Sequence, residues 1–182
     1  MPWSAAVTTQ FSLVDLYTHD ETEFYGPYNS LLFELFPTAE DYQISPQFKN
    51  VEGSLDFTIQ YIVHHRHMGP IFFLEIKAYR TLKDLSARVA ADDQTRQSFG
   101  TFASSQIPIP TLYGASAFGP VLCIYEFTTA TRRITPPRIL PERDIINDTA
   151  PEDRWEFDIM KEEGEARLRA VVTHIKAMAA TI

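Results

Sequence analysis

The chain has 182 residues, a length typical of one domain, and its hydrophobic fraction of 45% is ample for one packed core. Its net charge of −8 argues against tight non-specific binding to nucleic acid, which depends on dense lysine and arginine. No apolar stretch reaches the roughly 18–20 residues of a membrane span, and the N-terminus lacks a secretory-signal pattern. The single cysteine, Cys123, cannot form an internal disulfide, so we expect an intracellular protein, cytoplasmic or nuclear.

The first half of the chain predicts one helix followed by three strands. After an irregular or partly helical lead-in, residues 1–20, the sequence GPYNSLLFELFP (26–37) predicts a helix, since one proline suits its start and another stops it. Period-two alternation predicts strands at 42–48, 53–65 and 71–79. The first of these strands contains Pro46, which is typical of an edge strand.

The second half predicts a long helix, a hairpin and a closing helix. Gly119-Pro120 marks the hairpin turn, and the proline-rich segment 132–154 predicts a surface connection. The helices and strands are expected at 81–105, 111–118, 121–130 and 162–180. The order of elements predicts an α/β fold with a mixed central β-sheet flanked by helices.

The third predicted strand carries two charged residues within an apolar run. Glu75 and Lys77 are two residues apart, so their side chains point to the same face. Burying either charge costs several kcal/mol unless it is paired or bound to an ion. With the hairpin turn near Arg66 and His67, Asp56 is expected opposite Glu75 to Lys77 on the neighbouring strand. The spacing therefore predicts one cluster of two carboxylates and a lysine.

Such a cluster has the composition of a metal site. Two carboxylates this close repel each other unless a proton or a divalent cation lies between them. Oxygen ligands suit Mg²⁺, which typically uses one or two carboxylates and keeps several waters. A lysine nearby could orient or deprotonate an attacking water, or stabilise developing negative charge. The chemistry predicted is phosphodiester hydrolysis assisted by Mg²⁺ or Mn²⁺.

The sequence SLDF, with Asp56, and the sequence FFLEIKAY, with Glu75 after 18 intervening residues, together resemble the PD-(D/E)XK nuclease superfamily. The resemblance implies a restriction-endonuclease-like αβββαβ core over residues 27 to about 128, with an extra hairpin strand and a C-terminal helix. It implies one domain, residues 1–182, with a C-terminal extension over 129–182. Asp56 and Glu75 would bind the metal, and Lys77 would act on the attacking water. Leu55 stands where the family has proline.

The resemblance also implies further site residues. Some family members add a glutamate from the first helix or from just before it, and here Glu23 is favoured over Glu34, which faces away from the apolar side. Family members often place a polar residue on the next helix, where Asp92 and Arg96 fall on the apolar side. Arg96, with Arg88 two turns earlier, would contact phosphate.

These residues have structural interpretations as well. Asp56, Glu75 and Lys77 could form a cross-strand ion-pair network on a half-exposed sheet face. Asp92 and Arg96 could be an ordinary surface pair. The sequence HHRH, residues 64–67, lies too far along its strand from Asp56 to join the site and predicts a solvated hairpin tip. Solvated loop positions are expected for Arg132, Arg133 and Arg138.

The leading functional hypothesis is a Mg²⁺-dependent nuclease, with DNA favoured over RNA as substrate. The second is a catalytically inactive descendant of the same fold that serves as a binding or assembly module, which the acidic balance favours. The third is a structural domain whose ionic cluster is incidental. A homodimer could form through the C-terminal helix or an edge strand, and no contact with a membrane is expected.

Overall fold

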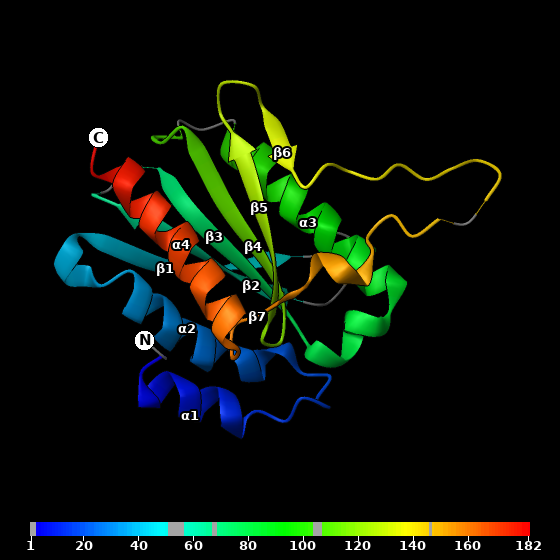
Figure 1. Cartoon of the computed structure of the whole chain (residues 1–182), viewed down its shortest axis with the longest axis horizontal. Coiled ribbons are helices and arrows are strands. Elements are labelled where there is room, and N and C mark those ends of the chain that lie inside the picture. Colours follow the sequence, from blue (N-terminus) through cyan, green and yellow to red (C-terminus); the bar gives the residue numbers. More distant parts are fainter. Residues whose placement is uncertain (1–2, 51–56, 67–68, 104–106, 146) are drawn as a thin grey trace.

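The computed structural model describes residues 3–50, 57–66, 69–103, 107–145 and 147–182. A central mixed sheet runs through these residues, flanked on both faces by helices (Figure 1). The fold is therefore α/β, as the order of elements predicts.

Seven strands of the described residues form this sheet, in the order β1-β2-β3-β4-β5-β6, with β7 also pairing with β5. β3 and β4 are parallel, and the other pairs are antiparallel. The strands are β1 (Tyr42–Asn50), β2 (Phe57–His65), β3 (Pro70–Lys77), β4 (Thr111–Phe118), β5 (Val121–Thr128), β6 (Arg133–Thr135) and β7 (Phe157–Asp158). The predicted strands at 42–48, 71–79, 111–118 and 121–130 are confirmed. β6 lies inside the segment predicted as a surface connection, which was wrong for those three residues.

The helices of the described residues are α1 (Ala5–Leu13), α2 (Tyr25–Leu35), α3 (Leu85–Ala103) and α4 (Glu162–Ala179). Short 3-10 turns stand at η1 (Glu21–Phe24), η2 (Thr38–Glu40), η3 (Tyr79–Lys83) and η4 (Glu152–Arg154). The predicted helices at 26–37, 81–105 and 162–180 are confirmed within a few residues. No helix in the described ranges has both the length and the apolar character that crossing a membrane requires.

The two faces of the sheet are covered by different helices. In Figure 1, α1, α2 and α4 cover one face and α3 covers the other. β3 contributes side chains to the hydrophobic core on each face of the sheet, because its side chains alternate between the faces. Phe72, Leu74 and Ile76 pack on the first face, and Phe73 packs on the second. Full burial of each such side chain stabilises the fold by about 1.5–3 kcal/mol. The strand is buried on both sides, as its apolar run predicts.

The absence of a side chain at Gly114 makes room for the Phe73 ring on the face of the sheet that α3 covers. Gly114 lies opposite Phe73 in the parallel β3–β4 pair, and a Cβ there would lie 2.4 Å from the Phe73 ring. The ring occupies that space and packs edge-on against Phe99 of α3, with ring centroids 4.8 Å apart. Phe73 thereby anchors α3 over the end of β3 where Glu75 lies.

The register predicted for the β2–β3 hairpin is wrong. Gln60, and not Asp56, lies directly opposite Glu75, and the register shifts between Val63 and His64. The extra residue on β3 at this irregularity shifts the pairing by one position, which is part of the difference from the predicted register. Asp56 itself lies outside the described residues.

The HHRH segment is only partly a solvated tip. Arg66 is exposed, but His65 is buried, and its ring lies 4.9 Å from that of Tyr42 on β1. Tyr42 is the cross-strand neighbour of His65, so the β1–β2 pairing brings the two rings together. His67 lies outside the described residues.

Candidate functional site

Glu75 is held from two sides beneath α3. Its side chain is only 2% exposed. Its Oε1 accepts hydrogen bonds from Gln60 Nε2 at 2.8 Å and from Ser98 Oγ at 2.7 Å. Gln60 comes from the neighbouring strand β2 and Ser98 from the inner side of α3, so a strand and a helix fix the carboxylate between them.

Polar atoms without partners lie among the same elements. Gln60 Oε1, Gln94 Oε1 and Thr95 Oγ1 are buried, and within the described ranges none of them has a hydrogen-bond partner. Gln94 and Ser98 are one helical turn apart, and Ser98 Oγ lies 3.0 Å from the Gln94 carbonyl. A buried polar atom left unsatisfied costs about 1–3 kcal/mol, so a water or an ion at this place would be stabilised.

Lys77 lies on the same face of β3 as Glu75, at the strand's last residue. Its Nζ is 3.8 Å from Glu21 Oε2, and the two side chains are 18% and 22% exposed. Glu21 begins η1, immediately before α2. The end of β3 therefore presents a buried carboxylate and a half-buried ion pair on one face.

Glu21 was missed in the sequence, where Glu23 was favoured. Glu23 is exposed, and Glu34 instead lies 3.2 Å from the backbone nitrogen of Ser4 and 3.6 Å from Arg169. A usable signal was the four-residue spacing between Glu21 and Tyr25, whose hydroxyl donates to Glu21 at 2.8 Å. That contact turns the Glu21 side chain inward.

The oxygen atoms of Glu75 and Gln60 are of the kind that binds a hard divalent cation. Carboxylate and amide oxygens are ligands that Mg²⁺ accepts, and Glu75 and Gln60 supply one of each in a buried place. Within the described part of the chain, no three His, Cys, Asp or Glu side chains come close enough together to hold a metal ion. The predicted role of Asp56 as a ligand falls outside the described residues and stays a prediction.

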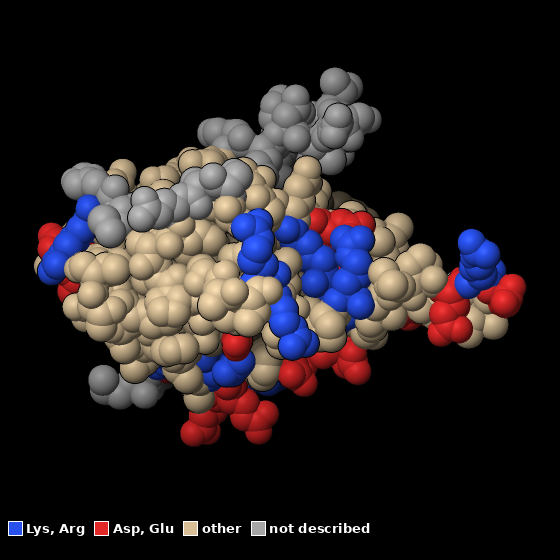
Figure 2. All heavy atoms as spheres, turned by 90° about the horizontal axis from the view of Figure 1, so that it is seen from above, with Lys and Arg blue, Asp and Glu red and all other residues tan. Residues whose placement is uncertain are grey.

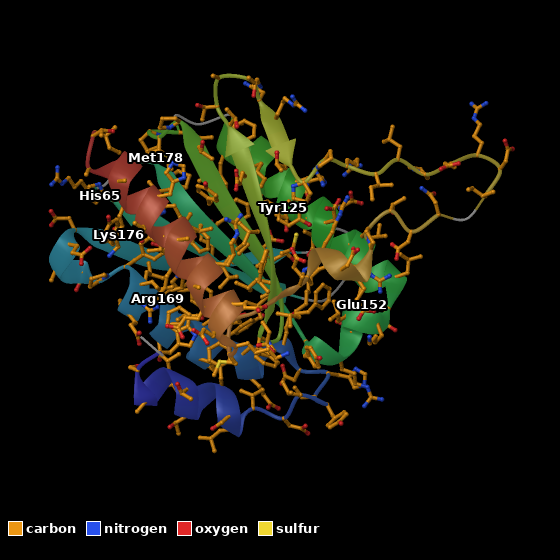
Figure 3. All side chains as sticks on the ribbon, viewed as in Figure 1. His65, Tyr125, Glu152, Arg169, Lys176 and Met178 are labelled. Carbon is orange, nitrogen blue, oxygen red and sulfur yellow. The ribbon has the colours of Figure 1, made fainter. Side chains whose placement is uncertain are left out.

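Arg96 lies in a buried network rather than on an open surface. Its guanidinium donates to Asp92 at 2.7 and 3.0 Å and to the Pro136 carbonyl at 2.9 Å. Asp92 also accepts from Arg154 and from the Tyr125 hydroxyl, each at 2.8 Å. In Figure 3, Tyr125 lies between β5 and α3. The interpretation of Asp92 and Arg96 as a surface pair is wrong, because both side chains are less than 10% exposed.

Arg88 is likewise bonded within the protein. It donates to Asp148 at 2.7 Å, to the Ala150 carbonyl at 2.7 Å and to the Leu82 carbonyl at 2.9 Å. Only 6% of the residue is exposed. Arg88 and Arg96 therefore tie the segment after β6 to α3, and their predicted contact with phosphate would require those bonds to open.

Two ionisable groups beside this network stay protonated. Burial raises the pKa of the Cys123 thiol to about 12, and burial also raises the pKa of the Tyr125 hydroxyl, reinforced by Cys123 and Asp92. A thiol that stays protonated at neutral pH is a poor nucleophile, so Cys123 is a core residue.

Comparison of the chain with models of known families, with curated proteins and with solved structures gives no match.

Proposed function

We propose that the protein is a Mg²⁺- or Mn²⁺-dependent nuclease that hydrolyses phosphodiester bonds, in DNA in preference to RNA. One observation carries the proposal. Glu75 and Lys77 share one face at the end of a central strand, with the carboxylate buried and fixed by Gln60 and Ser98. Hydrogen bonds that fix a carboxylate in this way support a role for Glu75 as a metal ligand, because ligating carboxylates are commonly oriented by such partners.

The arrangement of the elements supports the same proposal. The chain runs from α2 through three consecutive antiparallel strands to α3 and then to β4, which pairs with β3 in parallel. This is the αβββαβ order that the resemblance to the restriction-endonuclease-like core implies, and we propose that the chain has that core. Of the residues that resemble the PD-(D/E)XK motif, 72–77 lie on β3, and 54–56 lie outside the described residues.

The proposed mechanism gives each residue a role. Glu75 would hold the metal ion, together with Asp56 from outside the described residues. When bound, the ion would act as a Lewis acid on the phosphate and would lower the pKa of a bound water. Lys77, kept in place by Glu21, would orient that water or stabilise the negative charge that builds up on the phosphate oxygens. One phosphorus–oxygen bond forms from the water oxygen, one breaks, and the leaving oxygen takes up a proton.

The alternative is an inactive nuclease-like domain that serves as a binding or assembly module, including as a homodimer. The observation that favours it is that Glu75 accepts hydrogen bonds from an amide and a hydroxyl inside the fold. Such bonds lower the cost of burying the carboxylate without a metal.

The test is a cleavage assay on single- and double-stranded DNA with Mg²⁺ or Mn²⁺. We expect Glu75→Gln and Lys77→Met each to reduce the rate by at least about a hundredfold, as loss of one electrostatic group typically does. The control is Glu126→Gln, a glutamate on β5 of the same sheet that pairs with Arg167 at 3.5 Å. This control should cleave at the wild-type rate.

Calorimetry with Mg²⁺ or Mn²⁺ separates the two proposals. Binding that is lost in Glu75→Gln and kept in Glu126→Gln supports the metal site. No binding at millimolar metal, or equal cleavage by Glu75→Gln and wild type, would refute the nuclease and leave the binding module.

A further inference from the structure

An open pocket of about 590 Å³ lies beside the end of β3 and is lined by Leu16, Tyr17, Tyr79, Arg80, Leu82 and Lys83. None of its lining side chains takes part in the hydrogen bonds of Glu75 or in those that join Asp92 to Arg96 and Arg154. Its two walls are the segment before η1 and the segment η3, which lie at the same end of the sheet in Figure 1.

The pocket adjoins the proposed catalytic residues through the chain itself. Tyr79 follows Lys77 by two residues, a separation of about 7 Å at most. The other wall leads directly into η1, whose first residue, Glu21, pairs with Lys77. A ligand in the pocket would therefore extend toward the Lys77 end of β3.

The residues that line the pocket include two basic ones, Arg80 and Lys83, and no acidic one. Residues 77–83 contain three basic residues and no acidic one, against a net charge of −8 for the chain. Arg80 is exposed, and among the described residues its side chain has no ion pair or hydrogen bond. Lys83 contacts Glu152 at 2.5 Å, but both side chains are exposed, so water or an anion can replace that contact. In Figure 3, Glu152 lies next to the green segment that contains η3.

The apolar lining suits a planar base. Tyr17 is 78% exposed and Leu16 is 40% exposed, although both are large and apolar enough to be buried in a core. An exposed aromatic ring beside a free guanidinium is the combination that binds unpaired nucleotides, since the ring stacks on the base and the cation contacts the phosphate.

We infer that this pocket binds one unpaired nucleotide of a single-stranded DNA chain, with its base against Tyr17 or Tyr79 and its phosphate on Arg80. The inference rests on the proposed function, because it assigns to that site a substrate with a single-stranded end. The bound nucleotide would present the next phosphodiester toward Lys77.

The test is binding of a fluorescent twelve-residue oligothymidylate, followed by anisotropy in EDTA so that no metal-dependent cleavage occurs. We expect Tyr17→Ala and Arg80→Ala each to weaken binding by at least about fivefold, the lower end of the effect of losing one stacked base. Both positions are exposed, and unfolding curves should match those of wild type. The control is Arg133→Ala. Arg133 is exposed and lies opposite Thr128 in the β5–β6 strand pair, at the end of β5 that is far from Val121 and the pocket. This variant should bind the oligonucleotide as tightly as wild type.

The outcomes separate this inference from the proposed function. If the oligonucleotide binds wild type and both pocket variants equally, or does not bind wild type at all, the pocket inference is overturned. The same holds if free thymidine monophosphate binds as tightly as the oligonucleotide, since the pocket would then not recognise a strand. If Tyr17 and Arg80 matter for binding but no cleavage depends on Glu75, the pocket inference stands and the nuclease proposal fails.

Discussion

Two buried carboxylates, Glu75 beneath α3 and Asp92 on α3 itself, differ in the kind of partner they have. Asp92 accepts hydrogen bonds from two guanidinium groups, those of Arg96 and Arg154, so its charge is balanced inside the fold. Glu75 accepts from the amide of Gln60 and the hydroxyl of Ser98, which orient the carboxylate without adding positive charge. Asp92 therefore has the surroundings of a structural residue, whereas the bonds from Gln60 and Ser98 are consistent with the metal-ligand role proposed for Glu75.

Replacing Arg96 tests the structural role at this scale. Arg96→Ala should reduce the free energy of unfolding by about 2–4 kcal/mol, because removing one partner of a buried ion pair leaves the other charge under-compensated. Arg154 and Tyr125 still bond to Asp92, which keeps the loss below the upper end of the usual range. Urea unfolding gives the measurement.

Arg138→Ala is the matched control for Arg96→Ala. Arg138 also pairs with a carboxylate of α3, Asp93, but both side chains are about half exposed. An exposed pair contributes about 1 kcal/mol at most, so the control should change stability little. Equal effects of the two variants would mean that Arg96 is not structural and is available for a ligand such as phosphate.

At the scale of elements, alternation in sequence gives the face of a side chain but not its partner. The predicted partner of Glu75 was Asp56 and the observed one is Gln60, four residues along the chain, and a shift by an even number of residues preserves the face. The irregularity between Val63 and His64 changes the register by one position and so contributes only part of this shift, and neither residue type marks such an irregularity. The strands could thus be predicted, and the exact cross-strand contact could not.

The helices show the same limit. The wheel of residues 81–105 correctly placed Asp92 and Arg96 toward the protein, because helical periodicity fixes direction. Their partners Arg154 and Pro136 come from a proline-rich segment forty or more residues further on, and Arg88 bonds to Asp148 across 60 residues. Local spacing carries no information on contacts at such separations.

The β1–β2 pair contains a histidine whose titration should affect stability. Burial, with a smaller contribution from Arg66, lowers the pKa of His65 below its ordinary value of 6.5, and Asp41 opposes this only in part. The unfolded chain therefore binds a proton near pH 6.5 while the folded protein does not. The stability from neutral His65 is fully present above about pH 6.5 and is lost as the pH falls from there toward the lower pKa of the folded state.

We expect His65→Phe to remove part of the loss of stability on acidification. Phenylalanine keeps an aromatic ring against Tyr42 but cannot take up a proton. In Figure 3, His65 lies at the same end of the molecule as Lys176 and Met178. Urea unfolding of both proteins at about pH 8 and pH 5 measures the difference. A loss between the two pH values as large in His65→Phe as in wild type would contradict the role of this residue.

At the scale of the whole molecule, the positive charges are dispersed. Figure 2 shows the end that carries the β5–β6 connection, where lysine and arginine side chains gather near the middle of the surface with acidic groups beside them. Arg132 and Arg133 are exposed there, although Arg133 begins β6 and its predicted loop position is wrong. The pocket that contains Arg80 lies at the opposite end of the sheet, since β3 ends beside Val121 and Arg133 lies beside Thr128. A long nucleic acid would not find one continuous basic track between these ends.

This distribution predicts a shallow salt dependence of strand binding. Each phosphate contact with single-stranded DNA contributes about 0.7 to the slope of log affinity against log salt, so Lys77, Arg80 and Lys83 together allow a slope of about 2 at most. The net charge of −8 lowers it further, because salt also screens the repulsion between the protein and the strand. Anisotropy titrations from about 50 to 300 mM salt measure the slope, and a value steeper than about 4 would require an extended basic surface.

Neutralising distant acids tests whether the repulsion acts over the whole molecule. Glu142 and Asp144 are exposed in the connection that extends away from the body in Figure 1, so Glu142→Gln with Asp144→Asn removes two negative charges without touching the pocket. We expect tighter oligonucleotide binding at about 10 mM salt, where the Debye length is about 30 Å, and no change at about 150 mM, where it is about 8 Å. A gain that persists at 150 mM would mean that this connection contacts the strand directly. No gain at either salt concentration would mean that affinity is set by the pocket's own cations alone.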